Sequence, residues 1–146
     1  MKSIYLASPF FDEEQIDRVK RVEQALADNK TVGDVFSPRL SQFPDLTFGS
    51  EEWQTTAYQH DLNHLNAADM VVAVADFTDD SVDSGTAFEI GYAVAQGKPV
   101  VLLHEKSGLV NLMLIQGATT YTTDAMAIKT LDFNDLPHTS YTGDIQ

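Results

Sequence analysis

The sequence predicts an α/β fold in which helices cover both faces of a mainly parallel sheet. Short apolar segments alternate along the chain with longer amphipathic ones, and this order is typical of such folds. Two apolar runs, at 70–75 and 99–103, are continuous, as in strands that are buried on both faces of a parallel sheet. The chain has 146 residues, of which 43% are hydrophobic. We therefore expect a single domain spanning residues 1–146.

The amino-terminal part of the chain is predicted to form a strand, a helix and a second strand. Ile4–Ala7 is a short apolar run that a Ser-Pro dipeptide ends. Asp12 is expected to cap the helix, because apolar residues recur at helical spacing from there to Asn29. Val32–Phe36 is the second strand.

An irregular segment separates this part from the next helix. Residues 39–49 show no clean period and contain a proline and a glycine. Loops of this length without structure are often functional. Ser50 is expected to cap the second helix, which has acidic residues in its first turn and apolar residues as far as Leu65.

The remaining elements continue the alternation. In chain order they are a strand at Met70–Ala75, a helix at about Thr86–Gln96 that Gly97 ends, a strand at Pro99–Leu103, a helical turn at Asn111–Ile115, a weak strand at Thr119–Thr122 and a helix at Ala125–Leu131. The polar tail, about 135–146, is expected to pack on the surface or on a neighbouring subunit. The whole predicts a three-layer sandwich around a mainly parallel five-stranded sheet, of the Rossmann or flavodoxin-like type.

Acidic residues strongly outnumber basic ones. Nine Lys and Arg stand against 22 Asp and Glu, which gives a net charge of −13 and an isoelectric point near 4.3. Such a surface repels phosphate backbones and anionic lipids, so neither nucleic acid nor a membrane is an expected partner. The amino terminus lacks the features of a signal peptide and no apolar run is long enough to span a membrane, so we expect a cytoplasmic protein. The absence of cysteine excludes disulfides, thiolate nucleophiles and Cys-ligated zinc.

Ligands of open parallel sheets bind outside the carboxyl ends of the strands, which selects the loops after residues 7, 36, 75 and 103. The first loop contains Phe10 and Phe11, which suit a flat ring but also suit the simpler role of fastening the first helix to the core. The sequence alone favours the simpler role.

The loop after the third predicted strand contains four aspartates, at 76, 79, 80 and 83. Carboxylates can bind a hard cation, although the spacing is not that of an EF-hand and a solvated acidic loop is the more frequent explanation. The small residues that follow, including Gly85, let a ligand approach the backbone closely. Neither the dinucleotide nor the triphosphate glycine motif is present, so no such cofactor is expected.

Glu89 lies within the third predicted helix. By periodicity it shares a stripe with Ala93, whereas Phe88 and Gly91 belong to the apolar side, so the pattern favours an ordinary solvated acid. Asp83, however, lies just ahead of the same helix. Both carboxylates can line one cleft, and paired carboxylates are the usual acid and base of glycosidic chemistry.

A possible zinc site is found in the second predicted helix. His60 and His64 are four residues apart and share a helix face, as in the H-E-x-x-H pattern. A third ligand would have to be His104 or His138, and neither has an indicative spacing. Surface histidines are the favoured interpretation, and we expect no metal.

Four segments match, in order and over nearly the whole chain, a family of known enzymes. They are Ile4–Phe10 (IYLASPF), Asp61–Asn63 (DLN), residues 83–93 (DSGTAFEIGYA) and Asn111–Met113 (NLM). Each segment is weak alone, but together they are specific. On these residues the sequence resembles the nucleoside 2-deoxyribosyltransferase family.

The resemblance implies that Glu89 is the nucleophile of a double displacement. Its carboxylate would attack the anomeric carbon of a 2′-deoxynucleoside, expel the base and hold the sugar as a glycosyl ester until a second free base attacks, which retains the β configuration. Tyr5 would orient the nucleophile. Asp83 and Asp61 would bind the base and move its proton, and Gln42 would contact the base. Phe10 and Gly85 would also lie beside the substrate.

The resemblance also implies a homo-oligomer, commonly a hexamer, in which Asn111 and Met113 complete the site of a neighbouring subunit. One departure concerns the carboxyl terminus. Some relatives end in an aromatic residue whose carboxylate approaches the sugar, whereas this chain ends in Gln146, which puts a role of the tail in doubt.

Two other functions remain open. Nucleotide N-glycosidases of the same superfamily hydrolyse nucleoside 5′-monophosphates, but phosphate binding needs cations or clustered hydroxyls, and Arg39 is the one cation expected near the cleft. A neutral nucleoside is therefore favoured. The third function is a non-enzymatic module that binds nucleosides or a cation. The choice between purine-only and broader specificity depends on the cleft near residues 39–49.

Overall fold

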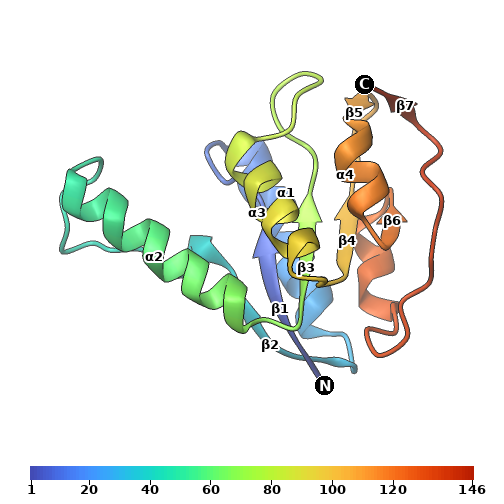
Figure 1. Ribbon diagram of the computed structural model, residues 1–146, viewed down its shortest axis with the longest axis horizontal. Helices are drawn as coiled ribbons and strands as arrows, with labels where there is room; N and C mark the ends of the chain where they lie inside the picture. The colour runs from blue at the N-terminus through green and yellow to red at the C-terminus, as the bar shows by residue number, and fades with distance from the viewer.

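The computed structural model describes residues 1–146 and has a central sheet with helices on both faces (Figure 1). The strands are β1 (Lys2–Ala7), β2 (Val32–Phe36), β3 (Met70–Val74), β4 (Val100–Leu103), β5 (Leu109–Val110), β6 (Thr120–Thr122) and β7 (Asp144–Ile145). The α-helices are α1 (Glu13–Ala27), α2 (Glu51–Ala67), α3 (Ser84–Ala95) and α4 (Leu112–Gly117), and the 3₁₀ helices are η1 (Pro38–Leu40) and η2 (Ala125–Thr130). No helix is both long and apolar enough to cross a membrane.

The main sheet has the strand order β2-β1-β3-β4-β6, and every neighbouring pair is parallel. The predicted five-stranded α/β sandwich is thus confirmed. From β1 the chain first moves outward to β2 and then returns to the other side of β1 with β3, so the direction of winding reverses between β1 and β3. In open α/β sheets, ligands bind at the carboxyl ends of the strands beside such a reversal.

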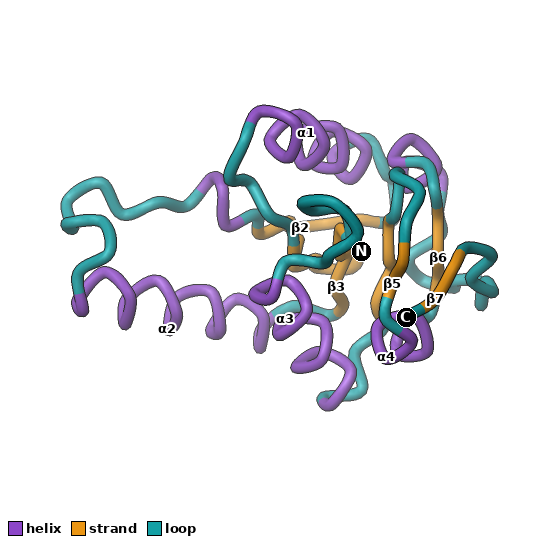
Figure 2. The backbone as a smooth tube through the Cα atoms, turned by 90° about the horizontal axis from the view of Figure 1, so that it is seen from above, coloured by secondary structure: helices purple, strands orange, loops and turns teal.

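Alternation along β1 decides which side chains face the site. Leu6 packs in the apolar core between the sheet and α1, whereas Tyr5 points to the opposite face and packs with Leu65 of α2 and Ile90 of α3. Figure 2 shows α1 on one side of the sheet and α2, α3 and α4 on the other. Tyr5 is fully buried. Its ring therefore lies beneath the two helices that carry the acidic candidates.

Helix capping follows the sequence closely. Asp12 accepts a hydrogen bond from the Gln15 amide and Ser50 accepts one from the Trp53 amide, which confirms both predicted caps. Two differences occur near the carboxyl end. The predicted helix at 125–131 is a 3₁₀ helix, and the tail forms β7, which pairs in parallel with β5 in a small second sheet that the sequence did not predict.

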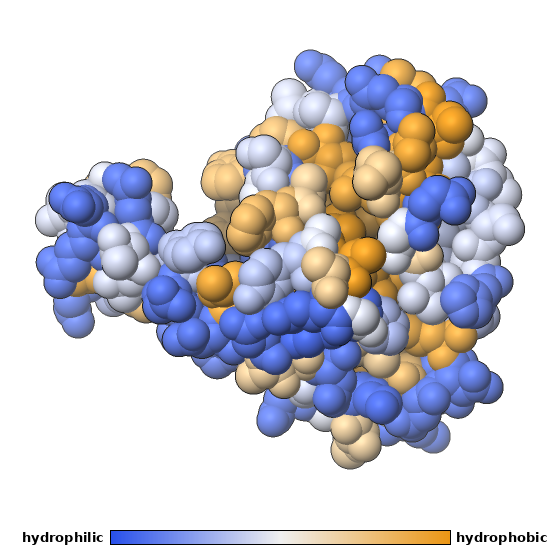
Figure 3. Space-filling model, viewed as in Figure 1, coloured by the Kyte–Doolittle hydropathy of each residue, from blue (hydrophilic) through white to orange (hydrophobic).

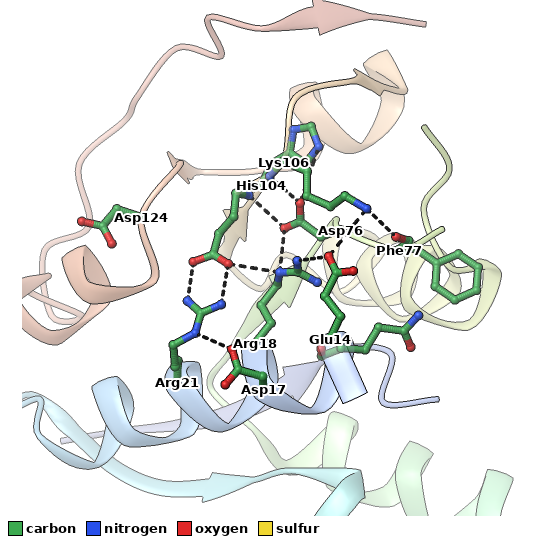
Figure 4. A network of polar contacts seen from close by, with 12 residues as sticks. Glu14, Asp17, Arg18, Arg21, Asp76, Phe77, His104, Lys106 and Asp124 are labelled. Atoms are coloured by element: carbon green, nitrogen blue, oxygen red, sulfur yellow. Dashed lines mark hydrogen bonds and ion pairs between the residues drawn. The ribbon is translucent and has the colours of Figure 1, made fainter. Parts of the chain in front are cut away.

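A buried polar network joins the loops after β3 and β4 to α1 (Figure 4). Asp76 is 2% exposed and accepts hydrogen bonds from the amides of Glu105 and Lys106 at 2.9 and 2.7 Å. Arg18 donates to Glu105, as does Arg21. A buried carboxylate requires such partners. The expectation that the loop at 76–80 is solvated is therefore wrong at Asp76, and the loop after β4 serves the framework rather than the cavities described below.

Candidate active site

Tyr5 and Glu89 form the centre of the candidate site. The Tyr5 hydroxyl, at the carboxyl end of β1, donates a hydrogen bond to Oε2 of Glu89 on α3. The other carboxylate oxygen, Oε1, does not accept this hydrogen bond. Burial, followed by the negative charge of Glu89, raises the pKa of Tyr5, so the phenol keeps its proton and remains a donor.

Glu89 is partly buried, which corrects the reading of its helix. The buried residues of α3 are Thr86, Ile90 and Ala93, whereas Phe88 and Gly91 are exposed. The face that sequence analysis assigned to solvent is therefore the one turned towards the protein. Burial raises the pKa of Glu89 to about 8, the Tyr5 hydrogen bond opposes this shift, and repulsion from Asp61 and Asp83 adds to it.

Asp83 and Asp61 reach the same place from two different helices. Asp83 is the N-cap of α3 and accepts hydrogen bonds from the amide and hydroxyl of Thr86 at 2.9 and 3.0 Å. Asp61 projects from α2, and burial raises its pKa. Two of the three carboxyl groups thus have raised pKa values. A raised pKa favours the protonated form of a carboxyl group, which can donate its proton to a leaving base.

Two cavities open beside this carboxylate group, and both are lined by Asp61, Gly85 and Glu89. The larger, of about 430 Å³, is called here the aromatic cavity. Its further lining is mainly aromatic or small: Ser8, Pro9, Phe10, Phe11, Pro38, Ser41, Gln42, Phe43, Phe48, Trp53, Ala57 and Asp83. The smaller, of about 210 Å³, is called the helix groove and lies between Tyr58, Leu62 and Leu65 of α2 and Phe88 of α3.

The aromatic cavity is lined by residues that sequence analysis selected and by several that it missed. Phe10 and Gln42, which the family resemblance places near the substrate, both line it. Phe43, Phe48 and Trp53 were not singled out. The spacing of Trp53, Ala57 and Asp61, each four residues apart on one helix face, is the signal that identifies the α2 part of this wall.

No lysine or arginine lines either cavity. Arg39, the one cation expected near the cleft, is instead paired with Glu23 of α1, with its Nε and Nη2 donating to the two carboxylate oxygens at 3.1 and 2.6 Å. The Ser37 hydroxyl donates to the same carboxylate. Arg39 is therefore engaged away from the cavities.

Asn111 and Met113 do not line either cavity of their own chain. The Asn111 side chain caps α4 by accepting a hydrogen bond from the Met113 amide at 2.9 Å, and Met113 is 73% exposed. Within one chain the structure thus brings together Tyr5, Asp61 and Glu89 with their neighbours but leaves this pair outside.

His60 and His64 take part in an aromatic cluster at the end of β2. The His64 ring stacks on Phe36 with centroids 3.8 Å apart, and the His60 ring meets the edges of Phe36 and Phe43. No group of three His, Asp or Glu side chains lies close enough together to hold a metal ion.

The raised pKa of Glu89 predicts that this residue destabilises the folded protein without substrate at alkaline pH. The folded state holds a proton up to about pH 8, whereas the unfolded state releases it near 4.5, so stability falls as pH rises through this window. We expect Glu89→Gln to leave the melting temperature unchanged below pH 4.5. Above pH 8 the variant should gain on the order of 2 kcal/mol, after discounting for partial exposure, or about 5 °C.

Thermal melts across this pH range test the prediction, with Asp135→Asn, an exposed acid without a side-chain partner, as the matched control. Parallel pH dependence in Glu89→Gln and the wild type would contradict it.

The fold is that of an α/β protein that carries a group of three carboxylates beside an aromatic cavity. The sequence model of the family described as nucleoside 2-deoxyribosyltransferase matches residues 4–129. A nucleoside deoxyribosyltransferase of Limosilactobacillus fermentum is 40% identical over 90% of this chain and 86% of its own length. One of Lactobacillus leichmannii is 29% identical over 70% of this chain and 69% of its own length. This chain belongs to the nucleoside 2-deoxyribosyltransferase family.

Solved structures agree with this assignment. A 2-deoxyribosyltransferase from Bacillus psychrosaccharolyticus superposes with a TM-score of 0.86 at 40% identity, covering 96% of this chain and 99% of that chain. A CMP N-glycosidase from Clostridium botulinum superposes with a TM-score of 0.55 at 22% identity, covering 88% of this chain and 96% of that chain, and shows the shared fold alone.

Proposed function

We propose that this chain transfers the 2-deoxyribosyl group of a 2′-deoxynucleoside to a free purine or pyrimidine base. The observation that carries the proposal is the partly buried Glu89, which lines the aromatic cavity and accepts a hydrogen bond from Tyr5. Family membership supplies the reaction class. A cavity of about 430 Å³ is large enough for a nucleoside, and its aromatic walls suit a flat base.

The proposed reaction uses two displacements at one carbon. Oε1 of ionised Glu89 forms a bond to C1′ while the C1′–N bond breaks, and the departing base takes a proton from Asp83 or Asp61. The sugar is then held as a glycosyl ester. A second base attacks C1′, gives its proton to the same carboxylate and frees Glu89. Two inversions give retention, and the transition states resemble oxocarbenium ions that the adjacent carboxylates stabilise.

Tyr5 has a positioning part in these steps. Its hydroxyl holds Oε2, which fixes the rotation of the Glu89 carboxylate so that the other oxygen points to the substrate. The same hydrogen bond lowers the pKa of Glu89 against the opposing effect of burial. Tyr5 therefore increases the ionised fraction of the nucleophile at neutral pH.

A neutral nucleoside fits this site better than a nucleotide. Phosphate recognition requires paired cationic or clustered hydroxyl donors, whereas the cavities contain three carboxylates and no cation. Since Arg39 is paired with Glu23, no guanidinium turns towards the sugar. This arrangement disfavours the alternative of a nucleoside 5′-monophosphate N-glycosidase.

We also propose that the protein self-associates, as the resemblance to a hexameric family implies. Apolar side chains gather on the face formed by α3 and α4 (Figure 3). The exposed apolar residues of these two helices include Phe88 of α3 and Leu112 and Met113 of α4. The exposed Tyr58 of α2 lies beside Phe88, with ring centroids 6.4 Å apart. The helix groove beside Glu89 is apolar and suits a side chain such as methionine. Met113 of a second copy would fill it and bring Asn111 towards the sugar.

One assay tests the proposed reaction. The wild-type protein is mixed with thymidine and adenine, and the products are separated by chromatography. We expect deoxyadenosine and thymine in equal amounts, with thymidine 5′-monophosphate at least about 100-fold less effective as a donor because its phosphate meets uncompensated carboxylates. Accumulation of thymine and free deoxyribose without deoxyadenosine would show a hydrolase instead.

A further inference from the structure

The segment 41–48 forms one wall of the aromatic cavity but has few ties to the rest of the fold. Ser41, Gln42, Phe43 and Phe48 line the cavity. The backbone hydrogen bonds of this segment are all local, such as those from the Leu46 amide to the Phe43 carbonyl and from the Ser41 amide to the Pro38 carbonyl of the adjacent η1. None joins the segment to a strand or to an α-helix. The position of this wall therefore depends on side-chain contacts.

His60 of α2 contacts two residues at the start of this wall, Ser41 and Phe43. Its Nε2 forms a hydrogen bond with the Ser41 hydroxyl group, with 2.9 Å between the two heavy atoms. Its ring meets the Phe43 ring edge-on, with centroids 5.2 Å apart and planes at 88°. On its other sides the same ring contacts Phe36, at the end of β2, and His64, one helical turn further along α2. His60 thus connects the wall to the sheet.

The opposite wall is set independently of His60. Phe10 and Phe11 stack on each other with centroids 6.1 Å apart, and Phe11 meets the edge of Phe77. The Phe77 carbonyl accepts a hydrogen bond from Lys106, which belongs to the network around Asp76 (Figure 4). This wall is therefore held by the polar framework, and the distance between the two walls depends on the segment that His60 holds.

We propose that His60 is a positioning residue that sets the width of the aromatic cavity and thereby the preference for small or large acceptor bases. The proposal rests on the proposed transferase function. A flat base gains most when both of its faces contact a wall, so a looser second wall reduces binding. A two-ring purine keeps more of its contact area with the fixed wall than a one-ring pyrimidine does. Loss of His60 should therefore weaken cytosine binding more than adenine binding.

Kinetics of His60→Ala test the proposal, with thymidine as donor, cytosine or adenine as acceptor and Gln59→Ala, an exposed neighbour on α2, as control. We expect the KM for cytosine to rise about tenfold, the KM for adenine to rise about threefold and kcat to change by less than about threefold. His60→Phe keeps the ring contacts and should give an intermediate KM.

Fluorescence gives a readout that does not depend on activity. Trp53 is the only tryptophan, and its ring lies 4.6 Å from that of Phe48 at the far end of the wall. We expect His60→Ala, but not Gln59→Ala, to shift Trp53 emission to the red and to increase its quenching by acrylamide.

An unchanged ratio of the two KM values together with unchanged Trp53 emission would overturn the proposal, as would a loss confined to kcat. If His60→Ala does not fold, His60→Phe carries both measurements. Absence of exchange in the wild type would instead contradict the proposed function, and the fluorescence of the variants would still test whether His60 holds the wall.

Discussion

Replacing Glu89 by glutamine is expected to lower the rate of deoxyribosyl exchange by about 10⁴-fold or more, because the variant has no nucleophile for the first displacement. Glutamine keeps the size of the side chain and can still accept the hydrogen bond from Tyr5. The loss would therefore report chemistry rather than packing. Initial rates with thymidine and adenine measure it, and Asp135→Asn, the exposed acid used above, should retain the full rate.

The covalent intermediate gives a direct test of the same role. Rapid denaturation of the wild type in the presence of thymidine alone should trap a deoxyribosyl group on the peptide that contains Glu89, detectable by mass spectrometry. Glu89→Gln should yield no adduct. If Glu89→Gln exchanges bases at more than a hundredth of the wild-type rate, Glu89 is not the nucleophile.

Mixing two inactive variants is expected to restore activity if neighbouring subunits share a site. Asn111→Ser retains an oxygen that can cap α4 but is too short to reach a neighbouring sugar, so we expect it to lose about 100-fold in activity with little effect on stability. Glu89→Gln is inactive for a different reason. In a randomly mixed oligomer of equal amounts, about a quarter of the sites combine an intact Glu89 with an intact neighbouring Asn111.

Co-expression of the two variants with different tags, followed by purification on both tags, provides the mixed oligomer. Recovery of about a quarter of wild-type activity in the mixed oligomer supports the shared site. An activity no higher than the sum of the residual activities of the two variants would contradict it. The mass of the wild-type assembly by light scattering serves as the accompanying control.

Much of the fold could be predicted because its elements are encoded locally. The buried runs at β3 and β4 and the caps at Asp12 and Ser50 were each visible in a few consecutive residues. The strands β5 and β7 were not, because two residues have no period and their pairing depends on the tertiary position of the tail. The 3₁₀ geometry of η2 likewise depends on packing rather than on helix propensity.

The site was less accessible to sequence reasoning, and α3 shows why. The apolar face of this helix, with Phe88, is exposed, and Glu89 is turned towards the protein. We propose that α3 both contributes to the site and contacts a second copy of the chain. In such a helix an acidic residue is turned inward and an apolar one outward, the reverse of the usual pattern. Phe43 and Phe48 were missed for another reason: the segment that contains them has no periodicity, so contacts with α2 place them.

The pairing of β5 with β7 gives the two ends of the chain different surroundings. The Gln146 amide donates to the Val110 carbonyl, and the Leu112 amide donates to the Gln146 carbonyl, both at 3.1 Å, so the carboxyl end lies against the segment that contains Asn111. Met1, by contrast, is 81% exposed and lies at the amino end of β1, whereas Ser8, Pro9 and Phe10, which line the aromatic cavity, follow its carboxyl end. An affinity tag, an immobilisation linker or a fused carrier protein placed before Met1 therefore has free space, whereas one placed after Gln146 must emerge beside Asn111.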